Sequence, residues 1–152
     1  MPLTHTDESG NVQMVDVGGK ADTPRVARAT GLLKIQPSHR EALSNLPKGD
    51  ALTTAQIAGI LGAKRTADLI PLCHPLPLDS VDVHITPTEQ GIEIEAIART
   101  SAKTGVEMEA YTAVVVAGIT LIDMLKGIDP DLTLTEVRLM EKTGGKRDWK
   151  RT

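Results

Sequence analysis

The sequence predicts an α+β protein, in which the regular elements follow one another as strand, helix, strand, strand, helix and strand. Residues 81–86 and 91–96 alternate apolar and polar side chains, as half-buried strands do. Residues 53–70 and 104–126 instead repeat apolar side chains at close to helical spacing. These two periodicities carry the prediction, and the remaining elements follow from the segments between them.

The first strand is expected over residues 25–36, and a polar connector follows over 38–50. A helix then begins at Thr53 or Thr54, because either residue is a favoured N-cap, and it runs to about Ile70. The apolar stripe of this helix is expected to face the core and consists of Ile57, Ala58, Ile60, Leu61 and Ala67.

The two alternating strands are expected to form a hairpin around residues 87–91, and a last strand follows over 132–140. The second helix lies between them. Thr104 with Glu107 three residues later fits a capping box, and the helix should end near Lys126. Because its middle is apolar on nearly every side, we expect the sheet to cover one side and a second subunit to cover the other.

This order of elements is typical of a ferredoxin-like split βαβ sandwich, an antiparallel sheet with two main helices, here predicted to be oligomeric. At 152 residues the chain should form a single domain, 1–152. A flexible N-terminal arm is expected over 1–24 and a C-terminal tail over 143–152. Many unrelated functions use this fold, so it does not indicate an activity.

The composition argues against several classes of protein. The formal net charge is −3 and the aromatic residues are Tyr111 and Trp149, so neither a nucleic-acid field nor a base-stacking platform is expected. The single cysteine excludes an internal disulfide and a multi-thiolate metal site. The N-terminal residues lack a signal-peptide pattern, and the apolar run near 113–122 is shorter than a membrane span, which favours a soluble cytoplasmic protein.

The stretch from Pro71 to Leu76 holds Cys73 and His74 on a stiff, non-helical connector. Such connectors often carry functional sites, although a turn with a buried thiol and a hydrogen-bonded histidine fits the same pattern. Thiol catalysis is disfavoured, because sequence neighbours in an extended connector diverge and leave the imidazole poorly placed to deprotonate the thiol. A metal site there would need ligands from other elements, among them His5, His39 and His84.

Each end of the second helix carries candidate functional groups. Asp123 and Lys126 lie at i and i+3, and under partial burial they would form an acid–base pair. A routine ion pair at a helix terminus is the alternative. At the other end Glu109 has no capping role, and a buried carboxylate needs a hydrogen-bond donor. The donor would be either the amide and amine edge of a guanine-type ring or a basic residue at a subunit contact.

Basic residues recur in the segments expected to be loops. Lys48 and Gly49 precede a helix, where backbone amides favour anions. If the basic side chains converge, they would suit a small phosphorylated ligand, whereas each alone would be an ordinary solvated charge. The residues in question are Lys20, Arg25, Lys48, Lys64, Arg65, Lys103, Lys142 and Lys146.

Several segments taken together carry a family resemblance. The most specific are the proline-flanked pair Cys73-His74 and the Lys-Thr-Gly-Val-Glu-Met-Glu run over 103–109. With the remaining segments they resemble the molybdenum cofactor biosynthesis protein C family, the cyclic pyranopterin monophosphate synthases. The match follows the order of the chain through 14–17, Lys20, Arg25, 48–50, 64–76, 103–110, 123–126 and 142–146.

The resemblance implies a lyase that converts (8S)-3',8-cyclo-7,8-dihydroguanosine 5'-triphosphate into cyclic pyranopterin monophosphate and releases pyrophosphate, a step of molybdenum cofactor biosynthesis. It implies no metal and no redox cofactor. It also implies homohexamers assembled as trimers of dimers, with active sites at subunit interfaces. The alternative is a non-catalytic oligomeric nucleotide-sensing module of ferredoxin-like fold.

For the site, the resemblance implies that Asp123, Lys126 and Lys48 form the acid–base group, with Asp123 the foremost catalytic residue. Lys20, Arg25 and Lys142 would hold the triphosphate, and the arm that carries the first two is expected to become ordered when the substrate binds. The full set of expected substrate-binding residues is Leu72, Cys73, His74, Met108, Glu109, Glu107, Arg25, Lys20 and Lys142.

Overall fold

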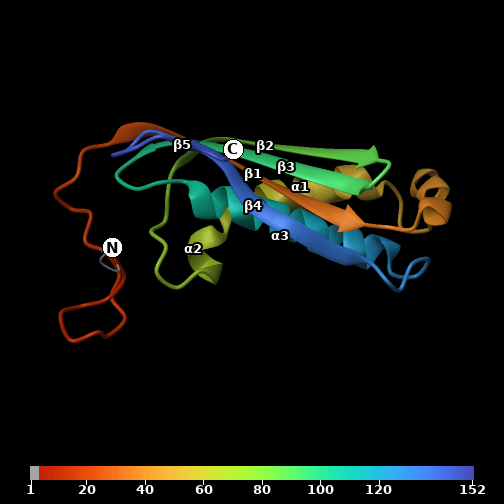
Figure 1. Cartoon of the computed structure of the whole chain (residues 1–152), viewed down its shortest axis with the longest axis horizontal. Helices are drawn as coiled ribbons and strands as arrows, with labels where there is room; N and C mark the ends of the chain where they lie inside the picture. Colours follow the sequence, from red (N-terminus) through yellow and green to blue (C-terminus); the bar gives the residue numbers. More distant parts are fainter. Residues whose placement is uncertain (1–3) are drawn as a thin grey trace.

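The computed structural model describes residues 4–152, and Figure 1 shows their helices and strands in two layers. The strands are β1 (Thr23–Lys34), β2 (Leu78–Thr88), β3 (Gly91–Ala102), β4 (Thr133–Thr143) and β5 (Trp149–Lys150). They form one five-stranded sheet in the order β2-β3-β1-β4-β5, and every neighbouring pair is antiparallel. This arrangement confirms the predicted α+β, ferredoxin-like fold.

The second layer consists of helices α1 (Ala51–Lys64) and α3 (Glu107–Leu125), which cover one face of the sheet. A 3₁₀ helix, η1 (Pro37–Ser44), lies in the segment predicted as a polar connector, and the short helix α2 (Thr66–Leu69) follows α1. Side chains alternate along each strand, so that one set faces the helices and the other faces away. On β1, for example, Ala27, Ala29 and Leu33 are fully buried.

Helix α1 packs against α3 through small residues, and the predicted apolar stripe is wrong at Ile57 and Leu61, although Ile60 packs against the core. Ile57 and Leu61 are each 53% exposed, whereas the buried positions are Ala51, Ala55, Gly59, Gly62 and Ala63. A Cβ at Gly59 would lie 3.0 Å from the carbonyl oxygen of Ala113, and one at Gly62 would lie 2.8 Å from Val116. Glycine therefore sets how closely the helices approach, a signal that apolar periodicity does not carry.

The close contact also corrects the prediction for α3. The sheet covers one of its sides, but α1 covers another, where a second subunit was expected. By length and composition alone α3 is apolar enough to cross a membrane, contrary to the estimate from the run 113–122. Half of that window is buried within the protein, so its apolar character is explained by its position in the core.

The boundaries of α1 differ from those predicted. Asp50 is its N-cap: the Oδ1 atom accepts a hydrogen bond of 3.0 Å from the backbone N–H of Thr53, and Oδ2 accepts one of 2.6 Å from the Thr53 hydroxyl. A carboxylate outcompetes the downstream hydroxyls because it accepts both bonds. The helix ends at Lys64, and a turn at Arg65 separates it from α2.

The predicted capping box at the start of α3 is wrong. The helix begins at Glu107, so this residue occupies the first helical position and not the third. Val106 is the N-cap and its side chain caps nothing. The carboxylate of Glu107 instead lies 3.2 Å from the ammonium of Lys142. The other end agrees with the sequence, since α3 stops at Leu125 and Lys126 is its C-cap.

The sheet continues into the C-terminal segment, for which the sequence predicted no strand. Trp149 and Lys150 pair with Lys142 and Glu141 of β4. The tail is strongly charged, so its side chains give no period-two signal. The pairing is stabilised by the side chain of Arg151, whose Nε donates a hydrogen bond of 2.8 Å to the carbonyl of Leu139.

The turn between β2 and β3 yields a test of the fold. Gly91 has φ +147°, and a Cβ there would lie 2.3 Å from the carbonyl oxygen of Leu33 on β1. We predict that Gly91→Ala lowers the free energy of unfolding by about 3 kcal/mol, through backbone strain and a steric clash, measured by urea denaturation. Gly127→Ala, where a Cβ meets nothing within 4 Å, is the control and should change stability by less than about 0.5 kcal/mol. Equal effects at the two sites would contradict the prediction.

Candidate active site

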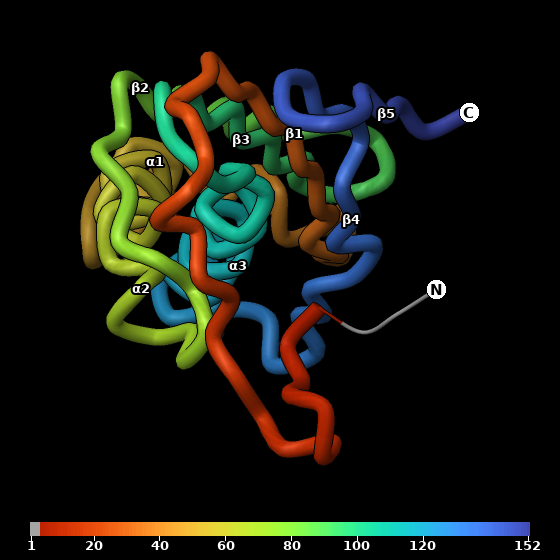
Figure 2. The backbone as a smooth tube through the Cα atoms, turned by 90° about the vertical axis from the view of Figure 1, so that its left-hand side faces the viewer, coloured from red at the N-terminus to blue at the C-terminus, as the bar shows by residue number. Residues whose placement is uncertain are grey.

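A cleft of about 480 Å³ lies at the N-terminal end of α3. Figure 2 shows the N-terminal arm running past the start of α3 beside the connector that joins α2 to β2, and residues of both segments line the cleft. The segment before α3 and the end of β4 complete the walls. The lining residues are Thr4, His5, Val15, Val17, Lys20, Leu72, Cys73, His74, Leu76, Thr104, Gly105, Glu107, Met108, Glu109 and Lys142.

Every predicted substrate-binding residue except Arg25 lines this cleft. Arg25 lies within β1 and not on the arm. Its Nε donates a hydrogen bond of 3.1 Å to the carbonyl of Ala102, and its Nη2 donates one of 3.3 Å to the carbonyl of Lys103. The guanidinium thus ties β1 to the segment that leads into α3, beside the cleft.

Glu109 is the buried charge of the cleft. It is 4% exposed and begins the buried face of α3. No ion pair to its carboxylate occurs among residues 4–152 of this single chain. Burial raises the pKa of Glu109 to about 7. The hydrogen bond from its own backbone N–H acts to lower this pKa, and the neighbouring carboxylate of Glu107 acts to raise it. A carboxylate in this state gains most from a ligand that brings hydrogen-bond donors.

Glu107 and Lys142 form an ion pair at the rim, with 3.2 Å between Oε1 and Nζ. The carboxylate folds back over Gly105, where a Cβ would lie 2.2 Å from Oε2. Lys20 of the arm is the second lysine that lines the cleft. A nearby lysine, Lys103, donates a hydrogen bond of 3.3 Å to the carbonyl of Gly18 and so holds the arm in place. The cleft therefore contains the buried carboxylate of Glu109, and the ammonium groups of Lys20 and Lys142 lie at its rim.

Cys73 has the electrostatics of an unreactive thiol. Burial raises its pKa, and the charge of Glu109 raises it further, so the thiolate is disfavoured. His5 joins Cys73 and His74 along the cleft, although the sequence analysis placed it on a separate element. Even so, no group of three or more His, Cys, Asp or Glu side chains within residues 4–152 has the arrangement of a metal site.

A second cluster lies at the C-terminal end of α3. The carboxylate of Asp123 contacts Lys126 Nζ through Oδ1 at 2.8 Å and Lys48 Nζ through Oδ2 at 3.1 Å. Lys48 also donates a hydrogen bond of 3.0 Å to the backbone carbonyl of Asp123. The hydrogen bonds from Lys126 and Lys48 lower the pKa of Asp123. The structure therefore brings together the three residues predicted as the acid–base group.

The partial burial predicted for this cluster is not present in the single chain, where the Asp123 side chain is 56% exposed. The two clusters are also far apart. Glu109 and Asp123 are fourteen residues apart on α3, which at about 1.5 Å per residue separates them by about 21 Å. Proton transfer requires hydrogen-bond reach, so one chain cannot present both clusters to the same reacting atoms.

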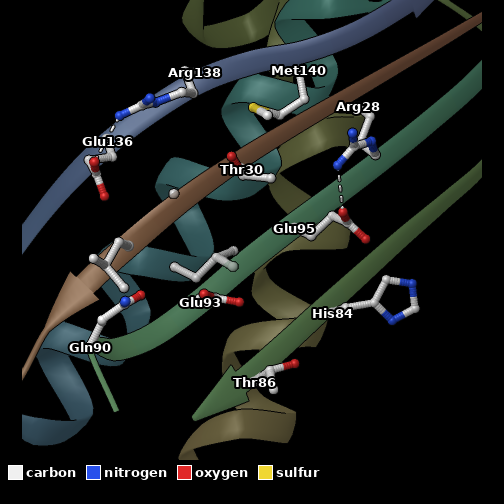
Figure 3. Close-up of a pocket in the computed structure, with 13 residues that line it drawn as sticks. Arg28, Thr30, His84, Thr86, Gln90, Glu93, Glu95, Glu136, Arg138 and Met140 are labelled. Carbon is white, nitrogen blue, oxygen red and sulfur yellow. Dashed lines mark hydrogen bonds and ion pairs between the residues drawn. The ribbon is translucent and has the colours of Figure 1, made fainter. Parts of the chain in front are cut away.

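Another hollow, of about 450 Å³, lies on the face of the sheet that the helices leave open (Figure 3). Both of its arginines are paired with carboxylates, and a further carboxylate, that of Glu93, also lines it. Arg28 lies 2.9 Å from Glu95, and Arg138 lies 2.9 Å from Glu136. None of the predicted site residues lines this hollow, and the paired charges leave no concentrated positive field for phosphates.

The sequence analysis missed several residues of the cleft. The apolar walls come from Val15, Val17 and Leu76, which belong to segments without regular secondary structure. A polar arm with isolated valines gives no periodic signal, so their position depends on how the arm folds back. A buried contact between His39 and Asp129 near the second cluster was also missed, because the residues are far apart in the sequence.

The fold, the cation-rimmed cleft and the carboxylate held between two lysines define a protein equipped to bind a small anionic molecule and to exchange protons with it. Comparison with known proteins identifies the family. The chain belongs to the MoaC family, whose model matches residues 14–145, and this confirms the resemblance drawn from the motifs.

Similar proteins include two named cyclic pyranopterin monophosphate synthase. The one from Streptomyces avermitilis is 54% identical over 99% of this chain and 90% of its own length. The one from Nostoc is 53% identical over 95% of this chain and 88% of its own length. The molybdenum cofactor biosynthesis protein 1 of Drosophila melanogaster is 52% identical over 98% of this chain, which spans 27% of that longer protein.

The raised pKa of Glu109 predicts a dependence of stability on pH. The folded protein holds this proton up to a pH of about 7, whereas the unfolded chain releases it near 4.5. The stability that the folded protein gains by holding this proton is fully present below pH 4.5 and is lost as the pH rises through about 7. Glu109→Gln has no proton to lose, so its advantage in free energy of unfolding should grow to about 2 to 3 kcal/mol at pH 8.

Urea denaturation from pH 4 to pH 8 measures this difference. Glu93→Gln, which removes an exposed carboxylate from β3, controls for the loss of one negative charge. Parallel pH profiles for the wild type and Glu109→Gln would show that the Glu109 side chain is not desolvated in the folded protein.

Proposed function

We propose that this protein is a cyclic pyranopterin monophosphate synthase, a lyase that acts on the cyclised dihydroguanosine triphosphate and releases pyrophosphate in molybdenum cofactor biosynthesis. The observation that carries the proposal is the carboxylate of Asp123 held between the ammonium groups of Lys48 and Lys126. The names of similar members of the family give the product, and the resemblance of the motifs implies the substrate and the release of pyrophosphate.

The cleft has the groups that this substrate requires. The guanine-derived ring carries an amide N–H and an exocyclic amine, which present two parallel donors to the buried carboxylate of Glu109. Lys20 and Lys142 on the rim supply positive charge for the triphosphate. Leu72, Cys73 and His74 line the same cleft as Met108, so the ring would contact both the connector before β2 and the start of α3.

The second cluster has the groups that the chemistry requires. The rearrangement opens one ring, builds another and closes a cyclic phosphate, so several protons must move. Since its two lysine partners keep Asp123 ionised, this carboxylate acts as the proton acceptor. Lys48 and Lys126 donate protons or stabilise the negative charge that develops on oxygen atoms.

A complete active site on this proposal contains the cleft of one chain and the Asp123 cluster of another. The separation of about 21 Å between Glu109 and Asp123 along α3 supports this arrangement, because the acid–base group must reach atoms held in the cleft. The outer surfaces of α1 and α3 expose Ile57, Leu61 and Ile119, and an apolar surface of this kind suits a subunit contact. We propose the homohexamer, a trimer of dimers, as the assembly.

The remaining parts of the proposal follow from the same family. The reaction needs no redox cofactor, because ring opening, ring closure and release of pyrophosphate together involve no net oxidation or reduction. It acts in the cytoplasm. A non-catalytic nucleotide-sensing module is the competing function, and such a module would bind the triphosphate without releasing pyrophosphate from it.

Asp123→Asn separates the two functions. The variant keeps the cleft intact and should bind the cyclic triphosphate with a dissociation constant within about threefold of the wild type. Turnover, measured as pyrophosphate release, should fall by about a thousandfold or more, because the amide cannot accept a proton. Lys126→Ala should also lower turnover.

Near-normal turnover in both variants would show that the acid–base assignment is wrong. If the wild type and both variants bind the substrate and none of them releases pyrophosphate from it, the sensing module is favoured.

A complementation experiment tests the shared site. We predict that Asp123→Asn and His74→Ala chains, each inactive alone, recover up to about one quarter of wild-type turnover when they are co-assembled. In random mixtures half of the clefts are intact and half of the acid–base clusters are intact, so one quarter of the composite sites contain both.

The matched control pairs Asp123→Asn with Lys48→Ala, which damages the same cluster in both chains. No composite site then has an intact acid–base group, and turnover should not recover. Failure of the first pair to recover, in assemblies shown to contain both chains, would place the whole site within one chain.

A further inference from the structure

Asp129 is a fully buried carboxylate, 1% exposed, in the loop that follows α3. Its Oδ2 accepts a hydrogen bond of 3.1 Å from the backbone N–H of Gln36, and its Oδ1 accepts one of 3.0 Å from the backbone N–H of Asp131. The Nδ1 atom of His39 lies 3.1 Å from Oδ2. These contacts, that of Gln36 first, lower the pKa of Asp129, so the group is an anion.

On the Nδ1 side of the His39 imidazole, the partner among the described residues is Asp129. Its Nδ1 atom is buried and makes no aligned hydrogen bond within residues 4–152, which leaves the charge of Asp129 as the group that stabilises it. A buried polar nitrogen is costly unless it is paired. The contact of 3.1 Å between Nδ1 and Oδ2 therefore links η1 to the loop after α3.

Helix η1 depends on such polar contacts for its position. It has no fully buried residue and no side-chain N-cap. Besides His39, the neighbouring Arg40 anchors it, since Nη2 donates a hydrogen bond to the backbone carbonyl of Glu89 in the β2–β3 turn. Leu43 is only partly buried against the core. Removing one anchor should let the helix shift without unfolding the sheet.

The segment that η1 positions ends at Lys48. A turn closed by the N–H of Gly49 on the carbonyl of Leu46 follows η1, and Asp50 then begins α1 as its N-cap. Lys48 thus lies between a segment held by Asp129 and a helix that is packed in the core. Its ammonium reaches Asp123, six residues before Asp129 in the chain.

We propose that His39 is a positioning residue for catalysis, which through Asp129 holds η1 and the following segment so that Lys48 reaches Asp123. The proposal rests on the proposed function of the Asp123 cluster. His39 touches no residue of that cluster in the structure. It acts by joining the two segments, 36–48 and 123–131, that carry the members of the cluster.

Replacing His39 by asparagine or by glutamine tests whether the contact at Nδ1, rather than the size of the side chain, matters at this position. The side-chain amide nitrogen of asparagine overlies Nδ1 of histidine, whereas that of glutamine overlies Nε2. His39→Asn should therefore keep the contact with Asp129 and retain kcat. His39→Gln should lower kcat about tenfold or more with KM within about threefold, because a small displacement of Lys48 impairs proton transfer more than binding.

A second measurement does not depend on turnover. Lys48 helps to lower the pKa of Asp123, so displacing it should raise that pKa. NMR titration of carboxyl-labelled aspartate, with the Asp123 signal assigned by Asp123→Asn, should give the same upward shift in His39→Gln and Lys48→Met. His39→Asn should titrate like the wild type. Glu41→Gln, on the exposed side of η1, is the matched control and should change neither kcat nor the titration.

Three results would overturn the proposal: wild-type kcat and titration in His39→Gln, equal losses in His39→Asn and His39→Gln, or a lowered unfolding temperature with kcat unchanged. If Lys48→Met itself keeps normal turnover, the proposed function of the cluster fails. The titration still decides whether His39 positions Lys48, so the two failures are distinguishable.

Discussion

The buried packing of α3 between the sheet and α1 is the constraint on which the rest of the structure depends. Gly59 and Gly62 let α1 approach so closely that α3 is covered by the sheet on one side and by α1 on another. Because a helix has a fixed rise per residue, Glu109 and Asp123 near its two ends are held about 21 Å apart. The candidate binding residues lie near the N-terminal end of α3, and the candidate acid–base residues lie near its C-terminal end. The geometry of a composite site is therefore set by how two copies of α3 meet in an assembly.

The two ends of α3 are electrostatically different, and this difference suits them to different roles. Glu109 is desolvated and has a pKa of about 7, so it is poised between the neutral and ionised forms until a ligand supplies donors. Asp123 is half exposed, and its two lysines keep it ionised. The first arrangement suits recognition of a ring edge and the second suits acceptance of a proton. Neither carboxylate could replace the other, because each depends on its own surroundings.

The order of elements was predictable because strands and helices impose different periods on apolar residues. The face that α1 buries was not, since close helix packing selects Gly59 and Gly62 where periodicity points to Ile57 and Leu61. Part of the cleft was predictable from the resemblance, because the segments 72–74 and 107–109 both line it. The apolar contribution of the arm and the contact of His39 with Asp129 depend on tertiary folding, which no local pattern reports.

The carboxylates of the proposed site lie on the most regular element of the chain, and most of its cations lie on irregular ones. Glu109 and Asp123 belong to α3, whereas Lys20 and Lys48 belong to the arm and to the segment after η1. Binding of a triphosphate changes the charge of the site greatly, and the cations must adjust to it more than the carboxylates. On the proposed function, carboxylates on a rigid helix would fix the ring and the proton acceptor, while the lysine-bearing segments would follow the phosphates. Polar anchors such as Asp129 then limit that adjustment where catalysis requires a fixed ammonium group.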